Sequence, residues 1–345
     1  MADVFAYLEG FGASGGSPNK STIIVTAPTG STVTCKMGST TKTATEKNGV
    51  WTFGGLDLGT WTITSTKGGD SATQDVAITR LTVEYVTIVY RITPEFTYTG
   101  DYEIVDDSDN PISDFASWKD NWKIRFLTSG TFTVTKLNGW NGQLDVFLVG
   151  GGGGGGNSST QWHEYGKDGI THGYGGGGGG GGYTATSINV SIVVGTNYVI
   201  TIGAGGAVST AGGMTSAFSG TANGGGAGGN ANGSTVGSPG KGGSNGGNGG
   251  SVGAGSTISA GSDGIPGQGT TTREFAEEGA TLYAGGGGGG TGYNGFGGTP
   301  TINSGGAGGG GKSNEAGTIN TGGGGGGGKA GGSGIAIIRN TRGAA

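Results

Sequence analysis

The stretch that decides the fold is Gln143-Leu144-Asp145-Val146-Phe147-Leu148-Val149, an apolar strand that runs directly into seven glycines, Gly150–Gly156. Pure glycine runs recur at Gly175–Gly182, Gly285–Gly290 and Gly322–Gly328. Of the 90 glycines in the chain, 74 follow residue 149, so the composition changes sharply at that point. The fold of the second half therefore depends on whether these runs are ordered.

Glycine tracts are ordinarily flexible linkers. Two features argue against linkers here: the tracts alternate with strands and aromatic residues, and the apolar segment Ile335–Ile338 needs a pairing partner, for which residues 144–149 are favoured. The ordered alternative is an array of polyglycine II helices, each with three residues per turn and a rise of about 3.1 Å per residue. Neighbouring helices can bond amide to carbonyl only if no Cβ separates the backbones.

Ordering glycine costs more conformational entropy than ordering any other residue, so such an array needs strands to hold it. Strands predicted within residues 94–149, 187–202 and 334–339 are placed to clamp the tracts. The only helical candidate is the short segment 273–278. The prediction is an all-β chain with almost no α-helix, in which a β-shell domain encloses an array of polyglycine II helices.

Residues 21–92 alternate apolar and polar side chains in seven short stretches separated by turn residues, which is typical of a small antiparallel β-sandwich. Its predicted core contains Val33, Trp51, Phe53, Trp61 and Ile63. The predicted organisation is an attachment or linker segment at 1–20, a β-sandwich at 21–92 and a glycine-rich domain at 93–345.

The charge pattern and the apolar pattern exclude several classes of partner. The formal net charge is −5 and no Lys/Arg cluster is present, so we expect no nucleic-acid partner. No run of about 18 apolar residues exists, which predicts no membrane insertion. The N-terminal residues lack the pattern of a secretory signal, so release by cell lysis is favoured. The single cysteine, Cys35, allows no internal disulfide.

No pattern for a cofactor, metal or catalytic group is convincing. Matches to G-x-G-x-x-G follow from composition alone, and Gly311-Lys312-Ser313 is not followed by a helix. His163 and His172 have no third ligand at a useful spacing, so no metal site is expected. Asp106, Asp107 and Asp109 form an acidic loop that predicts a solvated turn or a weak calcium site. We therefore expect a protein that is not an enzyme and needs no cofactor.

Residues 157–174, between the first two long glycine tracts, are the strongest candidate for a contact surface. Exposed Trp and Tyr give large contact areas and stack on sugars. The alternative is that Trp162 and Tyr165 only cap the array as a small core. The segments 270–284 and 291–304 are weaker candidates of the same kind. The contact candidates are Trp162, His163, Tyr165, His172, Tyr174, Tyr283, Tyr293 and Phe296.

Several of these stretches resemble known modules. Residues 21–88, with Val50-Trp51-Thr52-Phe53 and Leu58-Gly59-Thr60-Trp61, resemble the Ig-like or carboxypeptidase-regulatory modules of phage tail proteins. Residues 143–156 resemble the start of the glycine-rich domain of phage tail-fibre and tip adhesins, and residues 331–339 resemble its end. The resemblance covers most of the chain and is more specific to architecture than to function.

The resemblance implies a virion protein, assembled in the host cytoplasm and extracellular after lysis. It implies attachment to a bacterial surface glycan or protein through the loops between polyglycine helices, contacts to other virion proteins through residues 1–92, and a homotrimer as one assembly. The chain has no long shaft, which favours a tip, baseplate or decoration position. Two alternatives stay open: a non-adhesive head or tail decoration protein, and a bacterial surface or filament protein.

Overall fold

The structure is a computed structural model of the 345-residue chain. It describes residues 20–67, 70–88, 93–118, 120–138, 140–165, 168–233, 235–243, 261–265, 272–294 and 302–341. The chain divides into two compact units. The N-terminal unit contains residues 1–94 with 116–119 and 137–141, and the glycine-rich unit contains the remainder. Except for Lys20, the predicted attachment segment lies outside the described residues.

The described residues contain strands and only two single-turn 3-10 helices, Phe115–Ser117 (η2) and Glu274–Ala276 (η3). The prediction of an all-β fold with almost no α-helix is therefore confirmed. The one segment predicted to have helical tendency, 273–278, contributes just the single turn η3.

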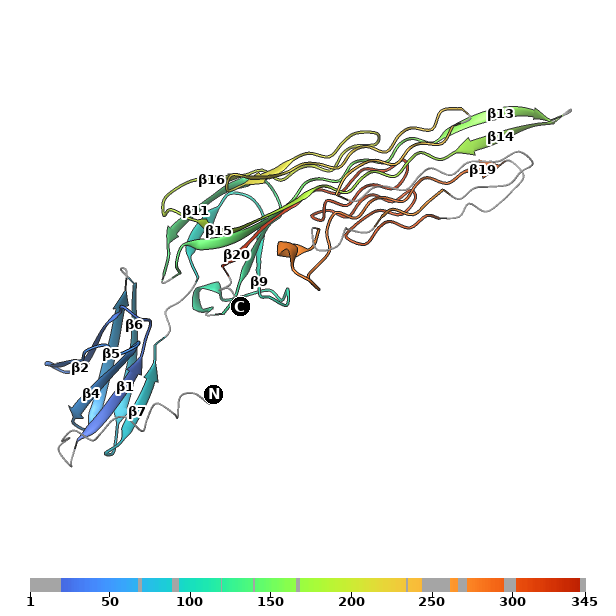
Figure 1. The fold of residues 1–345 in the computed structure, drawn as a ribbon. Helices are drawn as coiled ribbons and strands as arrows, with labels where there is room; N and C mark the ends of the chain where they lie inside the picture. The colour runs from blue at the N-terminus through green and yellow to red at the C-terminus, as the bar shows by residue number, and fades with distance from the viewer. Residues whose placement is uncertain are drawn as a thin grey trace. The chain divides into compact units, whose positions relative to one another are not determined.

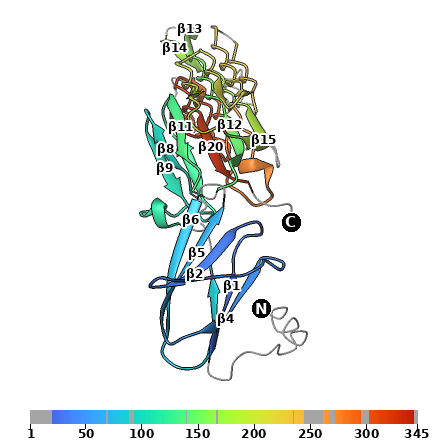
Figure 2. The ribbon, with the colours of Figure 1, turned by 90° about the vertical axis from the view of Figure 1, so that its left-hand side faces the viewer.

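The N-terminal unit is a sandwich of two sheets (Figures 1 and 2). One sheet has the order β4-β1-β7 and the other β3-β2-β5-β6. The strands are β1 (Ser21–Thr26), β2 (Thr32–Met37), β3 (Thr40–Thr43), β4 (Val50–Leu56), β5 (Gly59–Lys67), β6 (Asp70–Ile78) and β7 (Val83–Thr87). Strands β1 and β7 pair in parallel, unlike the predicted all-antiparallel arrangement. Five strands separate them in the chain, so no hairpin fixes their relative direction.

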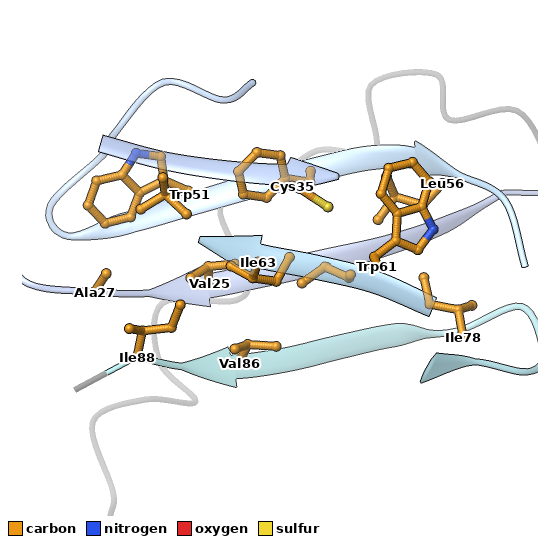
Figure 3. Packing of buried hydrophobic residues seen from close by; sticks show 13 residues of the cluster. Val25, Ala27, Cys35, Trp51, Leu56, Trp61, Ile63, Ile78, Val86 and Ile88 are labelled. Carbon is orange, nitrogen blue, oxygen red and sulfur yellow. The ribbon is translucent and has the colours of Figure 1, made fainter. Parts of the chain in front are cut away.

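The core of this unit comes from the inward residues of both sheets (Figure 3). All five predicted core residues, from Val33 to Ile63, are at most 3 % exposed. Alternation explains this, because β1 buries every second residue, and successive side chains of a strand point to opposite faces. Trp61 also donates its indole N–H to the Asp57 carbonyl at 3.0 Å, so its one polar atom is satisfied.

Two sheets form the base of the glycine-rich unit. The larger has the order β15-β12-β20-β10-β9, and the smaller β16-β11-β8. Their strands are β8 (Glu95–Tyr98), β9 (Tyr102–Val105), β10 (Lys123–Phe126), β11 (Gly130–Lys136), β12 (Gln143–Val149), β15 (Thr184–Ser191), β16 (Tyr198–Ile200) and β20 (Ile335–Asn340). Strand β20 lies between β12 and β10 and pairs Ile335 with Val149. The C-terminal apolar segment thus pairs with the strand favoured from the sequence.

The glycine tracts form a hydrogen-bonded array with residues 150–156 at its centre. Amides 150, 153 and 156 donate to one neighbouring segment, amides 151 and 154 to a second, and amides 152 and 155 to a third. Carbonyls 151–156 accept from three further segments, again with a period of three, and all these bonds measure 2.7–2.9 Å. The neighbours that accept are 177–183, 210–213 and 329–332, and those that donate are 225–228, 206–209 and 325–328.

A period of three with six neighbours is the arrangement expected of packed polyglycine II helices, which lack internal hydrogen bonds. The central segment is antiparallel to the three neighbours that accept from it and parallel to the three that donate to it. Figure 1 shows these segments running side by side from the base strands. Since β12 leads into the array and β15 and β20 leave it, the base strands hold the tracts at their ends.

Close approach of the backbones explains why the central tract is pure glycine. A Cβ added at any residue from 150 to 156 would lie 1.9–2.1 Å from a carbonyl oxygen of a neighbouring segment. In a helix at the periphery of the array, glycine is needed at only two residues in three. Ala204 and Ala207 are exposed, whereas Gly203 and Gly206 between the helices are buried. Other residues are therefore tolerated where one side of the helix faces solvent.

Candidate binding surface

The hairpin at the far end of the array occupies the strongest segment identified from the sequence (Figure 1). Residues 150–156 lead away from β12, the chain reverses through β13 (Ser159–Tyr165) and β14 (Asp168–Tyr174), and residues 175–183 return to β15. Strand β19 (Tyr293–Asn294) pairs with β14 to make a three-stranded sheet. At about 3.1 Å per residue, the seven central glycines separate this sheet from the base by about 22 Å.

The pairing of β13 with β14 sorts the described side chains onto two faces. Trp162 is opposite Thr171, whereas Gln161 is opposite His172 and Ser159 opposite Tyr174. Directly paired residues share a face of the sheet. Trp162 is 61 % exposed and Thr160 and Thr171 are also exposed, but His172 and Tyr174 are 7 % and 6 % exposed. One face is therefore packed, and the other presents an indole ring beside two hydroxyl groups.

The remaining contact candidates near the hairpin are described only in part. His163 and Tyr165 lie in β13 and Tyr293 lies in β19, but their side chains are outside the described part of the structure, as is all of Phe296. Trp162 is thus the one candidate whose described side chain is available for contact. The expectation that His172 and Tyr174 offer their side chains to a receptor is corrected by their burial.

Tyr283 is also corrected from a contact candidate to an interior residue. It is 5 % exposed and packs on Phe147, with ring centroids 5.4 Å apart. Its hydroxyl donates to Glu274 Oε2 at 3.2 Å. Burial, followed by the negative charge of Glu274, raises the pKa of the Tyr283 hydroxyl far above its ordinary value. The sequence segment 270–284 therefore contributes a buried anchor rather than a loop for contact.

A buried ion network holds this segment to the base sheet, and no sequence pattern pointed to it. Lys123 Nζ lies 2.8 Å from Glu274 Oε1 and 2.5 Å from Asp109 Oδ1. Arg125 lies 2.5 Å from the same Asp109 oxygen. The side chains of Lys123 and Glu274 are only 8 % and 4 % exposed, so each charge would be buried without compensation if the other were removed. The only available signal was the pair of basic residues within the apolar strand 122–127.

A second network joins Arg339 of β20 to the same segment. Its guanidinium lies 3.0 Å from Asp145 and 2.6 Å from Glu277, and 4.0 Å above the centre of the Phe275 ring. Phe275 itself has a φ of 53°, a conformation that costs energy for a residue other than glycine. Its ring packs against Arg339 and Phe147, so this backbone conformation places the ring in the buried interior.

The acidic loop after β9 is a capped turn. Asp106 accepts hydrogen bonds from the backbone amides of Ser108 and Asn110 at 2.8 Å each, and Asp109 is occupied by Lys123 and Arg125. The hydrogen-bonded turn, one of the two predicted alternatives for this loop, is present. No group of three metal-ligating side chains occurs among the described residues.

An array of polyglycine II helices held between a strand base and an end hairpin defines the architectural class of the glycine-rich unit. The chain belongs to the glycine-rich domain family, which it matches over residues 127–341. Comparison with curated proteins gives no match. The part of the chain that the structure describes contains no helix of the length and apolarity needed to cross a membrane.

Proposed function

We propose that this chain is a virion structural protein, a tail-fibre or tail-tip adhesin that attaches to the bacterial surface through the hairpin end of its glycine array. The observation that carries the proposal is the exposure of Trp162, 61 %, on a hairpin that the array holds away from the base. Large exposed aromatic side chains are common anchors of binding surfaces.

The physical support is rigidity. The hairpin strands continue directly into two tracts that are hydrogen-bonded to each other and to other segments, so Trp162 is presented on an ordered support. A pre-organised surface loses less conformational entropy on binding. A stalk without side chains in its interior also leaves the end loops free to vary without disturbing the core.

The hairpin end is better suited to contact with a partner than to catalysis. His172 is buried, and the carboxylates that form ion pairs in the described part of this unit, such as Glu274 and Asp145, lie at the base. The proposed partners are a bacterial surface glycan or protein at the hairpin, and other virion proteins at residues 1–92. A decoration protein is the second candidate, because Trp162 would serve equally well to contact a neighbouring subunit.

The test is binding of the fluorescently labelled full-length protein to a panel of bacterial strains. The Trp162→Ala variant is compared with Ile188→Ala, which removes a side chain of similar exposure, 66 %, from the base strand β15. Strain-selective binding that Trp162→Ala reduces at least about tenfold and Ile188→Ala leaves unchanged is expected. Equal binding by all three proteins would move contact away from the hairpin. Binding to no strain, with many copies on purified particles, would favour decoration.

A further inference from the structure

Three cavities beside the base sheet of the glycine-rich unit share lining residues from one to the next. The first, about 540 Å³, lies between the loop after β9 and the segment 274–281. The second, about 320 Å³, shares Asp109 and Thr281 with the first. The third, about 600 Å³, shares Leu127 and Asn320 with the second. We call the three together the base groove. It lies at the opposite end of the array from Trp162.

The rim of the base groove is acidic because several of its carboxylates face solvent while Lys123 and Arg125 do not. The side chains of Glu103 and Glu277 are 47 % and 52 % exposed. Those of Lys123 and Arg125 are 8 % and 14 % exposed. A charge at the surface acts on an approaching partner, whereas a buried and paired charge is largely compensated.

Negative charges also outnumber positive charges in the groove. Three cations, Lys123, Arg125 and Arg339, contact five carboxylates, those of Glu103, Asp109, Asp145, Glu274 and Glu277. Asp101 and Asp107 are exposed and line the groove as well. The groove and its ion networks therefore carry four more negative than positive charges at neutral pH. That excess nearly equals the net charge of −5 for the whole chain.

Apolar side chains also line the second and third cavities, and we call them the floor of the groove. Leu127, Ile202 and Leu282 are half-buried there, and Ile319 is 71 % exposed. Isolated apolar side chains are ordinary on a protein surface, but a row of them with a polar rim is typical of an interaction site. The groove thus combines an apolar floor with an acidic border along its length.

We propose that the base groove binds an extended basic segment of another protein, with Lys or Arg side chains at the acidic rim and apolar side chains on the floor. Three adjacent open cavities suit an extended peptide better than a compact ligand, which prefers a single enclosed pocket. The excess of negative charge selects a cationic partner and sets its orientation. This surface does not depend on the receptor role of the hairpin.

The probe is a fluorescein-labelled octapeptide of alternating Lys and Leu, titrated with the full-length protein by fluorescence anisotropy. The double variant Asp101→Asn/Glu103→Gln removes two exposed rim charges, and Ile319→Ser changes the floor. The matched control Glu84→Gln/Glu315→Gln removes the same charge elsewhere. Saturable binding is expected, weakened about tenfold by the rim variant, severalfold by Ile319→Ser and little by the control. Raising the salt concentration should weaken it further.

Several results would overturn the proposal. If the rim variant and the control weaken peptide binding equally, binding depends only on the net charge of the protein and not on the groove. Equal affinity for a Glu–Leu peptide would remove the role of the rim, and equal affinity for oligolysine would remove the role of the floor. Calcium binding that the rim variant abolishes, without any peptide binding, would make the groove a cation site instead. Unchanged thermal melting of each variant verifies that its fold is intact.

Discussion

The amide of Gly152 donates a hydrogen bond of 2.9 Å to the carbonyl oxygen of Gly332, which lies 180 residues further along the chain. The Gly152 carbonyl in turn accepts from Gly206 at 2.8 Å. A single glycine therefore joins three distant segments. Each such bond contributes only about 1 kcal/mol net, so stability depends on many of them forming together.

The first prediction concerns the steric requirement of this array. A Cβ at Gly154 would lie 1.9 Å from the Ala207 carbonyl oxygen, so Gly154→Ala must separate two helices. We expect the free energy of unfolding of the glycine-rich unit to fall by at least about 2 kcal/mol. The control is Ala207→Ser, since Ala207 is exposed on the outer side of its helix, and a change below about 0.5 kcal/mol is expected there. Urea denaturation followed by circular dichroism measures both, and equal stabilities would contradict the close packing.

That the glycine tracts are ordered could be predicted, because the steric condition for packing applies to each tract by itself. Gly150–Gly156 can have six neighbours only if none of its residues bears a Cβ, and the sequence satisfies that condition. The partners of each tract could not be predicted. One glycine tract carries no side chain that distinguishes it from another, so neighbour choice depends on the strands and turns that connect them.

The candidate site was predicted in part for a similar reason. Trp162 was predicted either to contact a partner or to cap the array, and its 61 % exposure is consistent with the first alternative. Tyr283 lies in a comparable loop, yet it is buried by Glu274 and Phe147. Lys123 and Glu274 are 151 residues apart, and long-range ion pairs leave no periodic pattern in a sequence.

The second prediction concerns that ion pair. Glu274→Ala leaves Lys123 and Arg125 buried with less compensation and removes the acceptor of the Tyr283 hydroxyl. The free energy of unfolding should fall by about 3 kcal/mol. The control is Glu95→Ala, whose side chain is 45 % exposed and pairs with Lys136 at 3.0 Å. Loss of an exposed pair should cost less than about 1 kcal/mol. Thermal denaturation measures both variants. Equal destabilisation by Glu274→Ala and Glu95→Ala would show that the buried network does not hold the segment containing Glu274 to the base sheet.

The third prediction concerns acid. Burial alone would raise the pKa of Asp109, but hydrogen bonds and positive charge from Lys123 and Arg125 outweigh it and leave the pKa below its ordinary value. The carboxylate thus stabilises the fold above the unfolded-state pKa of about 3.9, and that contribution disappears as the pH falls through the lower folded-state pKa. Lowering the pH from about 5 to 3 should therefore destabilise the wild type more than Asp109→Asn. The measurement is the free energy of unfolding of both proteins across this pH range. If it falls equally for wild type and Asp109→Asn, Asp109 does not contribute to the pH dependence.

The last prediction concerns Cys35, which lies fully buried in the sandwich core of the N-terminal unit (Figure 3). Burial raises the pKa of its thiol to about 11, with a smaller opposing effect of the positive charge of Lys42. Because the thiolate is the reactive form, neutral Cys35 should react with an aromatic disulfide reagent at pH 8 at least about a hundredfold more slowly in native protein than in urea. The variant Cys35→Ser/Thr41→Cys, with its thiol on the exposed edge of β3, should react rapidly without urea. Equal reaction rates of native Cys35 and this surface thiol would mean that the sandwich opens frequently. That result would contradict a tightly packed core, in which Trp51, Phe53 and Trp61 are at most 2 % exposed.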